Sequence, residues 1–251
     1  MKNIQHKLMI LLLVAFAFPN QTFSQENLTS EPSYEVNKVY AYISVSETNL
    51  KEAQTLSDLN YKYKSSWISE YISVEISTSQ NGKVTTALGE NDQLTQEQKD
   101  HLGKADPNTA ISVLINYIPE NNLKNKEAKE MDFTFSIDPA HDAAFPDGQL
   151  ELKQYLKQAV IDKTSSDVFK NYDLAAVKFT VNEDGKIANA HVVESSKDEK
   201  VDRLLLATIQ NMTDWKPAKY SNGLQVKQDF ILTVGNMESC VVNLLGIRRY
   251  K

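Results

Sequence analysis

The side chains that most often carry catalysis or hold metals are few in this chain and do not cluster. Beyond the first 24 residues the histidines are His101, His141 and His191, which are far apart and in none of the spacings that place two ligands on one helix face. No G-x-S-x-G motif and no phosphate-binding glycine loop occurs, and the single cysteine, Cys240, has apolar neighbours that favour a buried thiol over a reactive thiolate. We therefore expect a protein without catalysis, metal or cofactor, and no small-molecule substrate is evident.

The elements of the carboxyl-terminal third begin with a predicted β-hairpin. Val177, Phe179 and Val181 alternate along one face of a strand, and a return strand follows over residues 187–193. Between them, Asp184-Gly185 provides the positive φ angles that tight hairpin turns require. The pattern predicts two antiparallel strands with one buried face.

A helix and a closing strand complete this unit. Apolar residues recur at three- and four-residue intervals over Val201–Met212, with helix-capping candidates in Ser195–Asp198. Apolar and polar residues then alternate along Gln225–Val234, as expected for an antiparallel strand packed on one side. The segment is thus predicted to be a ββαβ unit, with Trp215 in the interface between helix and sheet.

The motifs of this region occur in a recognisable order. They are FPDG (Phe145–Gly148) before a helix with Leu152, Tyr155 and Leu156, the hairpin and turn over Val177–Ser196, the helix, DWKPAKYSNG (Asp214–Gly223), and the closing strand. Together they resemble the TonB C-terminal domain family. The segment Val160–Ala175 departs from it, because it lacks the proline and glycine that members commonly carry there.

The resemblance implies protein binding by strand pairing rather than catalysis. In that family the sheet edge near the closing strand receives a short segment of an outer-membrane receptor. Transferred to this chain, the partner-binding candidates are Gln225, Lys227, Gln228, Asp229 and Ile231. Two alternatives stay open: the strand is central, or its edge is covered by the apolar tail that follows it.

The first half of the chain shows a similar order of signals. A strand leads into Asn81-Gly82, the strongest short hairpin signal, and Leu94–Ala105 reads as a helix with Thr95 and Gln98 in a capping-box pattern. Strands are predicted over residues 110–118 and 131–137. Residues 81–87 align without gaps on residues 184–190, so either both halves are ββαβ units of similar shape, or any hairpin followed by a helix gives such a match.

These patterns predict an α+β fold with two small antiparallel-sheet domains of ββαβ character, the second TonB C-terminal-like. The expected organisation is a signal peptide (1–24), an α+β domain of unknown role (33–138), a linker (139–148), the TonB-like domain (149–236) and an apolar tail that could add a strand (237–251).

The amino terminus predicts export. Leu8–Phe18 is an apolar run of 11 residues behind two lysines, which is too short for a spanning helix and typical of a secretory leader cleaved near Ser24. Removing it takes away two lysines and no acid, so the formal charge moves from −6 to −8, which disfavours nucleic acid as a partner.

We therefore expect a periplasmic protein-binding or scaffold module that docks cell-envelope proteins, such as outer-membrane receptors, by strand addition. The oligomeric state is open, a homodimer included. The alternative is a TonB-type energy transducer held in the inner membrane by an uncleaved amino terminus. Only 7 prolines occur and they form no proline-rich run, so the spacer of true transducers is not expected here.

Overall fold

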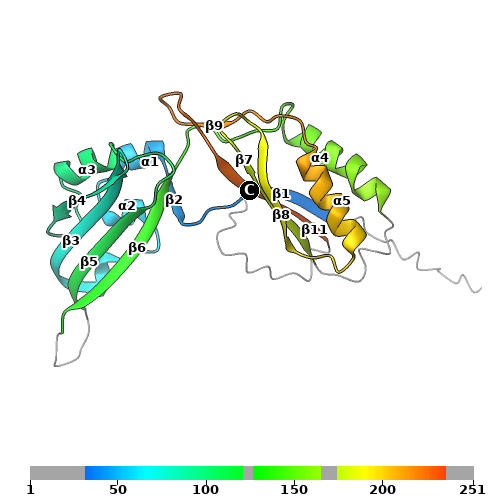
Figure 1. Cartoon of the computed structure of the whole chain (residues 1–251). Coiled ribbons are helices and arrows are strands. Elements are labelled where there is room, and N and C mark those ends of the chain that lie inside the picture. Colours follow the sequence, from blue (N-terminus) through cyan, green and yellow to red (C-terminus); the bar gives the residue numbers. More distant parts are fainter. Residues whose placement is uncertain (1–31, 121–126, 165–173, 236–251) are drawn as a thin grey trace, which may run out of the picture. The chain divides into compact units, whose positions relative to one another are not determined.

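The structure, a computed structural model, describes residues 32–120, 127–164 and 174–235. In these ranges the strands form a five-stranded sheet, a four-stranded sheet and a two-stranded ribbon, and helices cover one face of each larger sheet (Figure 1). The predicted α+β fold with antiparallel sheets is confirmed. Neighbouring strands pair antiparallel, except β2 and β6, which run parallel.

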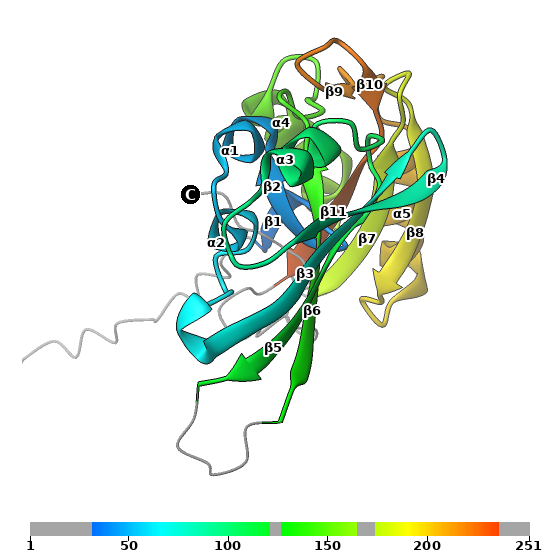
Figure 2. The ribbon, with the colours of Figure 1, turned by 90° about the vertical axis from the view of Figure 1, so that its left-hand side faces the viewer.

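The five-stranded sheet has the strand order β2-β6-β5-β3-β4. Its elements, in chain order, are β2 (Ile43–Ser46), α1 (Glu47–Glu52), α2 (Leu56–Leu59), the 3-10 turn η1 (Ser65–Trp67), β3 (Ile68–Gln80), β4 (Lys83–Gly89), α3 (Gln96–Leu102), β5 (Ile111–Pro119) and β6 (Lys129–Asp138). Inward residues of β3, β5 and β6, with Leu56, Leu59 and Leu102 from the helices, form its buried core. Figure 2 shows β3, β5 and β6 side by side.

The β3–β4 hairpin forms where the Asn-Gly pair predicts it. Asn81 and Gly82 both have positive φ, at 52° and 73°. The Asp106 carboxylate accepts hydrogen bonds from both of their backbone N–H groups, at 2.8 and 2.9 Å. A two-residue turn with positive φ at both positions matches the twist of the flanking strands. Asn81-Gly82 therefore sets the register of the hairpin.

The capping box predicted for α3 is also present. The Gln98 N–H donates to Thr95 Oγ1 at 3.1 Å, and the Thr95 N–H donates to Gln98 Oε1 at 3.0 Å. Two N–H groups that the helix itself leaves without acceptors are thereby satisfied. The helix begins at Gln96, one residue after its cap.

The four-stranded sheet has the order β1-β11-β7-β8. The elements of this half are β1 (Ser33–Lys38), α4 (Gln149–Ala159), the 3-10 turn η2 (Ile161–Lys163), β7 (Ala175–Val181), β8 (Ile187–Glu194), α5 (Glu199–Gln210), β9 (Ala218–Lys219), β10 (Gln225–Val226) and β11 (Gln228–Gly235). Figure 1 shows α4 and α5 on the same face of this sheet. The predicted hairpin and helix are present, with Asp198 as the helix cap, but the closing strand predicted over Gln225–Val234 is divided at Lys227 into β10, which pairs with β9, and β11.

The core beneath these two helices centres on Trp215. Its ring lies 5.1 to 5.9 Å, centroid to centroid, from those of Phe145, Phe179 and Phe230. The backbone N–H of Trp215 donates to the Gly185 carbonyl at 2.7 Å, which ties the tryptophan to the β7–β8 turn. The prediction that Trp215 closes the interface between helix and sheet agrees with these contacts.

The expected domain boundaries do not coincide with the sheets. β1 comes from the first half of the chain but pairs with β11 over Ser33–Lys38, because its alternating Tyr34 and Val36 pack against the second core. Residues 139–148 are not a free linker either: Phe145 is buried against Trp215, and Ala144 bridges to Lys216.

The two halves share a topology. In each, a hairpin (β3–β4 or β7–β8) is followed by a helix and a third strand that pairs antiparallel with the first strand of the hairpin. The sheet orders β4-β3-β5 and β8-β7-β11 therefore correspond. That the two units also have similar shapes is a prediction, and a superposition of residues 67–118 on residues 175–234 that fails to align the helix would refute it.

Candidate functional site

The predicted partner-binding strand, β11, is central in its sheet. It pairs with β7 on one side over Gln228–Val234 and with β1 on the other over Phe230–Gly235. The Val39 N–H also donates to the Asp229 carbonyl at 2.9 Å. The expectation of a free edge on this strand is therefore wrong for the described residues. The alternative of a central strand is observed, with β1 as the neighbour; the tail, residues 236–251, lies outside the described residues.

The burial of β11 explains its central position. Phe230, Leu232 and Val234 face the helices, but Ile231 and Thr233 on the opposite face are buried as well. A strand buried on both faces has a continuous apolar run rather than an alternating one. The run from Phe230 to Val234 carries that signal.

Gln228, predicted to bind a partner, instead holds its own chain together. Its Nε2 donates to Asp142 Oδ1 at 2.8 Å, and its Oε1 accepts from the Ala143 N–H at 2.8 Å. The Lys38 ammonium lies 2.6 Å from the other Asp142 oxygen. This network joins β1, β11 and the segment that leads into α4.

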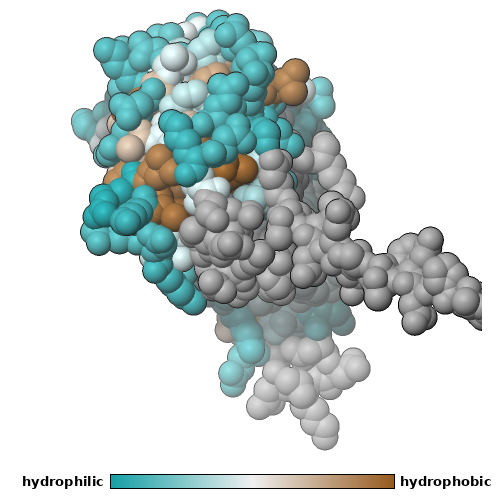
Figure 3. All heavy atoms as spheres, turned by 90° about the vertical axis from the view of Figure 1, so that its right-hand side faces the viewer, coloured by the Kyte–Doolittle hydropathy of each residue, from teal (hydrophilic) through white to brown (hydrophobic). Residues whose placement is uncertain are grey.

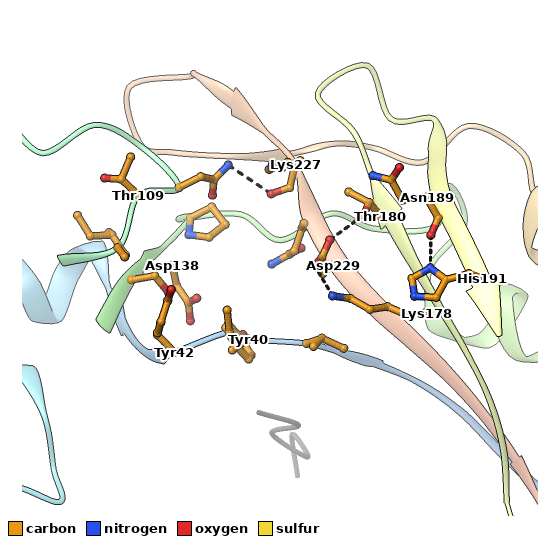
Figure 4. Close-up of a pocket in the computed structure, with 18 residues that line it drawn as sticks. Tyr40, Tyr42, Thr109, Asp138, Lys178, Thr180, Asn189, His191, Lys227 and Asp229 are labelled. Carbon is orange, nitrogen blue, oxygen red and sulfur yellow. Dashed lines mark hydrogen bonds and ion pairs between the residues drawn. The ribbon is translucent and has the colours of Figure 1, made fainter. Parts of the chain in front are cut away.

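Lys227, Gln228 and Asp229 also line a polar pocket of about 390 Å³, drawn in Figure 4. The Asp229 carboxylate accepts from Thr180 Oγ1 at 2.7 Å and lies 2.9 Å from the Lys178 ammonium. The charges of the pocket wall are thus largely paired within the chain. Gln225, in β10, and Ile231 are not among its lining residues.

The structure does not bring the three histidines together. His101 hydrogen-bonds with Gln80 and with the Thr85 carbonyl, His141 forms an isolated bridge with Lys219, and His191 contacts the Asn189 carbonyl. Only His191 of the three lines the polar pocket. In the described part of the chain, no three or more His, Cys, Asp and Glu side chains are grouped to hold a metal ion.

Sequence reasoning missed a groove beside β1. It measures about 690 Å³, and its wall is formed by residues 34–38 of β1 opposite α4. The apolar part consists of Val36, Leu152, Leu156 and Phe230, and Lys153 stands at its rim. On the face shown in Figure 3, hydrophobic residues gather in patches within a mostly hydrophilic surface.

The backbone of β1 alternates between its partner strand and this groove. Residues of an antiparallel ladder turn their N–H and C=O groups toward the partner at every second position. Because Val39 bonds to Asp229 and the Glu35 carbonyl accepts from Thr233 Oγ1, the odd-numbered residues face β11. Tyr34 and Val36 therefore direct their N–H and C=O groups outward, along the groove.

The opposite wall of the groove is held in place by α5. The hydroxyl of Tyr155, on α4, donates a hydrogen bond to the Thr208 carbonyl of α5 at 2.9 Å. Burial raises the pKa of this tyrosine. At the start of α5, partial burial raises the pKa of Asp202, but hydrogen bonds from Ser195 and Ser196 outweigh it, so the net shift is downward. Asp202 is thus held as a carboxylate that anchors the β8–α5 connection.

Comparison with known families bears on this half of the chain. The model of the family described as Gram-negative bacterial TonB protein C-terminal matches residues 173–234. Residues 173–234 form a TonB C-terminal-like domain. No curated protein and no solved structure matches the chain.

The match confirms the resemblance seen in the sequence and covers about a quarter of the chain. A TonB C-terminal-like domain implies a role in interactions with envelope proteins and a periplasmic, envelope-associated location. None of the helices in the described ranges is long and apolar enough to cross a membrane. In this chain the TonB-like sheet contains a further strand, β1, contributed by residues that precede the match.

Proposed function

We propose that the TonB-like domain is a non-catalytic docking module that binds an extended segment of another envelope protein by strand addition at the outer edge of β1. The observation that supports this is the combination of outward-facing backbone groups at Tyr34 and Val36 with an apolar groove beside them. Main-chain hydrogen bonds at a sheet edge give affinity, and pockets for alternate side chains give specificity.

The side of β11 that pairs with β1 is a poorer site for the same partner. Contacts through the backbone of Asp229 and Ile231 would require β1 to leave its ladder, together with the Lys38–Asp142 ion pair, and Gln228 is paired with Val181 of β7. Lys227 remains available to a partner through its side chain in the polar pocket, and Gln225 through its exposed position, whereas the Asp229 carboxylate is already paired with Lys178 and Thr180.

The expected affinity is modest. Tyr34 and Val36 offer two donors and two acceptors, and each hydrogen bond contributes about 0.5–1.5 kcal/mol net. One or two apolar side chains in the groove would add about 1.5–3 kcal/mol each, against an association cost of several kcal/mol. The gross gain of about 3.5–12 kcal/mol, less about 4 kcal/mol or more for association, leaves at most about −8 kcal/mol, so the affinity is micromolar at its tightest.

The test uses a photo-crosslinking side chain in place of Lys153, at the rim of the groove, in cells that export the protein. We expect a discrete adduct with an envelope protein, and we expect Val36→Pro to abolish it. Proline at this position removes an outward N–H and leaves the β1–β11 ladder intact, because proline is tolerated where the N–H faces away from the sheet.

Val36→Ala is the matched control: it removes the side chain but keeps the N–H, so the adduct should be weakened rather than lost. If Val36→Pro is folded by circular dichroism and still gives the full adduct, strand addition at β1 is refuted. The same probe in place of Lys200, at the start of α5, should give no such adduct, because α5 packs on β7 and β8.

The alternative of an energy transducer differs in its amino terminus. Intact-mass measurement of the exported protein distinguishes the two. A chain that begins at Gln25 supports the released docking module, and a chain that keeps residues 1–24 supports the transducer.

A further inference from the structure

The chain leaves the four-stranded sheet at the mouth of the groove. β11 ends at Gly235, and Gly235 pairs with Ser33, the first residue of β1. Whatever follows Gly235 therefore starts at the same end of the groove as β1 does.

The segment that follows has the composition of a strand for this groove. Asn236–Ser239 is followed by the apolar run CVVNLLGI, Cys240–Ile247. Passing over β1 to its outer side means moving two strand spacings, about 10 Å. Four residues reach up to ~13 Å, so the apolar run would begin beside the first residues of β1.

The sheet of the first half shows how a further strand can be added beyond the fourth. There the third strand, β5, pairs antiparallel with β6, and β6 pairs in parallel with a fifth strand, β2. In the second half β11 pairs antiparallel with β1. The place that corresponds to β2 is the outer edge of β1, and a strand arriving from Gly235 would run parallel to β1.

We propose that Cys240–Leu245 docks in the groove as a fifth strand, parallel to β1, so that the chain's own tail occupies the edge at which a partner binds. Its apolar side chains would cover Val36, Leu152 and Leu156, and its backbone would pair with Tyr34 and Val36. This inference rests on the proposed function in one respect: the partner and the tail compete for one edge.

Hydrogen exchange of the full chain tests the docking directly. In the free protein the Tyr34 and Val36 amides should exchange slowly, because they donate to the tail. Replacing both Val241 and Val242 by Asp places charges in an apolar groove, and it should speed exchange at these two amides by about tenfold or more. Asn236→Asp with Ser239→Asp adds the same charge just before the docked segment, without removing an apolar side chain, and should leave exchange slow.

The single cysteine gives a second readout. With Lys153→Cys on α4, mild oxidation should form an intramolecular disulfide with Cys240, seen as the loss of two hydrogens in the intact mass. With Lys200→Cys on α5 it should form slowly or not at all. A covalent dimer in place of the intramolecular disulfide would mean that the groove receives a second copy, which overturns docking within one chain.

The two proposals fail in different ways. Fast exchange at Tyr34 and Val36 in the unaltered protein, with the crosslink at Lys153 still present, removes the tail and leaves partner docking. Slow exchange that depends on Val241 and Val242, with no crosslink under any condition, supports the tail and refutes partner docking. If the tail and a partner both bind this edge, the Asp substitutions at Val241 and Val242 should increase the yield of the partner adduct.

Discussion

Gly185 offers the sharpest test of how the TonB-like core is closed. Its φ is +81°, and a Cβ added there would lie 2.0 Å from the Trp215 carbonyl oxygen. That oxygen cannot move away alone, because the backbone N–H of the same residue, Trp215, donates to the Gly185 carbonyl at 2.7 Å. In Gly185→Ala the left-handed backbone costs about 1–2 kcal/mol, and loss of the hydrogen bond adds about 0.5–1.5 kcal/mol. We therefore expect a loss of unfolding free energy of about 2–4 kcal/mol once Trp215 is displaced.

Gly223→Ala is the matched control, because Gly223 has a similar φ of +86° but nothing within 4 Å of an added Cβ. It should cost only about 1 kcal/mol, since the restriction of the unfolded chain offsets part of the strain. Urea unfolding followed by tryptophan fluorescence measures both, because Trp215 is buried whereas Trp67 is half exposed. Equal losses in the two variants, within about 0.5 kcal/mol, would refute the close approach as the cause.

Three further predictions concern other parts of the fold. Thr95→Ala removes one side of the capping box and should cost about 1 kcal/mol in thermal or urea unfolding. Gln228→Ala leaves a buried N–H without its acceptor and should cost about 1–3 kcal/mol, whereas the exposed Gln225→Ala should stay within about 0.5 kcal/mol of the unaltered protein. The pKa of Asp106 lies below its usual 3.8, first because the Gly82 amide donates to its carboxylate. Its contribution to the β3–β4 turn is therefore present above pH 3.8 and is lost as the pH falls through the lowered pKa. A pH titration of the Gly82 amide by NMR should show this loss, and Asp106→Asn should remove the dependence.

Local signals in the sequence predicted local structure well. Asn81-Gly82 and Asp184-Gly185 sit in the two hairpin turns with positive φ at the expected glycines, and Asp198 caps α5. In each case the residues that carry the signal also make the contact. A turn or a cap depends on neighbours a few residues away, so it can be read without knowing the fold.

The pairing of β1 could not be read in this way. The alternation in Ser33–Lys38 indicates a strand, but nothing local says that its partner is β11 rather than a strand of the first half. For the same reason the sequence predicts Gln228 as a contact for a partner, although its amide bonds to Asp142 and Ala143. The groove beside β1 depends on both of these long-range arrangements, which is why it is visible only in the structure.

The distance along the chain between β1 and β11 also affects how the protein is made. Glu35 and Thr233, which contact one another in the ladder, are 198 residues apart. β1 is synthesised first and cannot pair until β11, the last strand of the sheet, has been made. Pairing between strands so far apart in the chain is slow. Until the residues of β11 have been made, Tyr34 and Val36 of β1 lack the strand that holds them against the core, and this interval is when misfolding and aggregation are most to be expected.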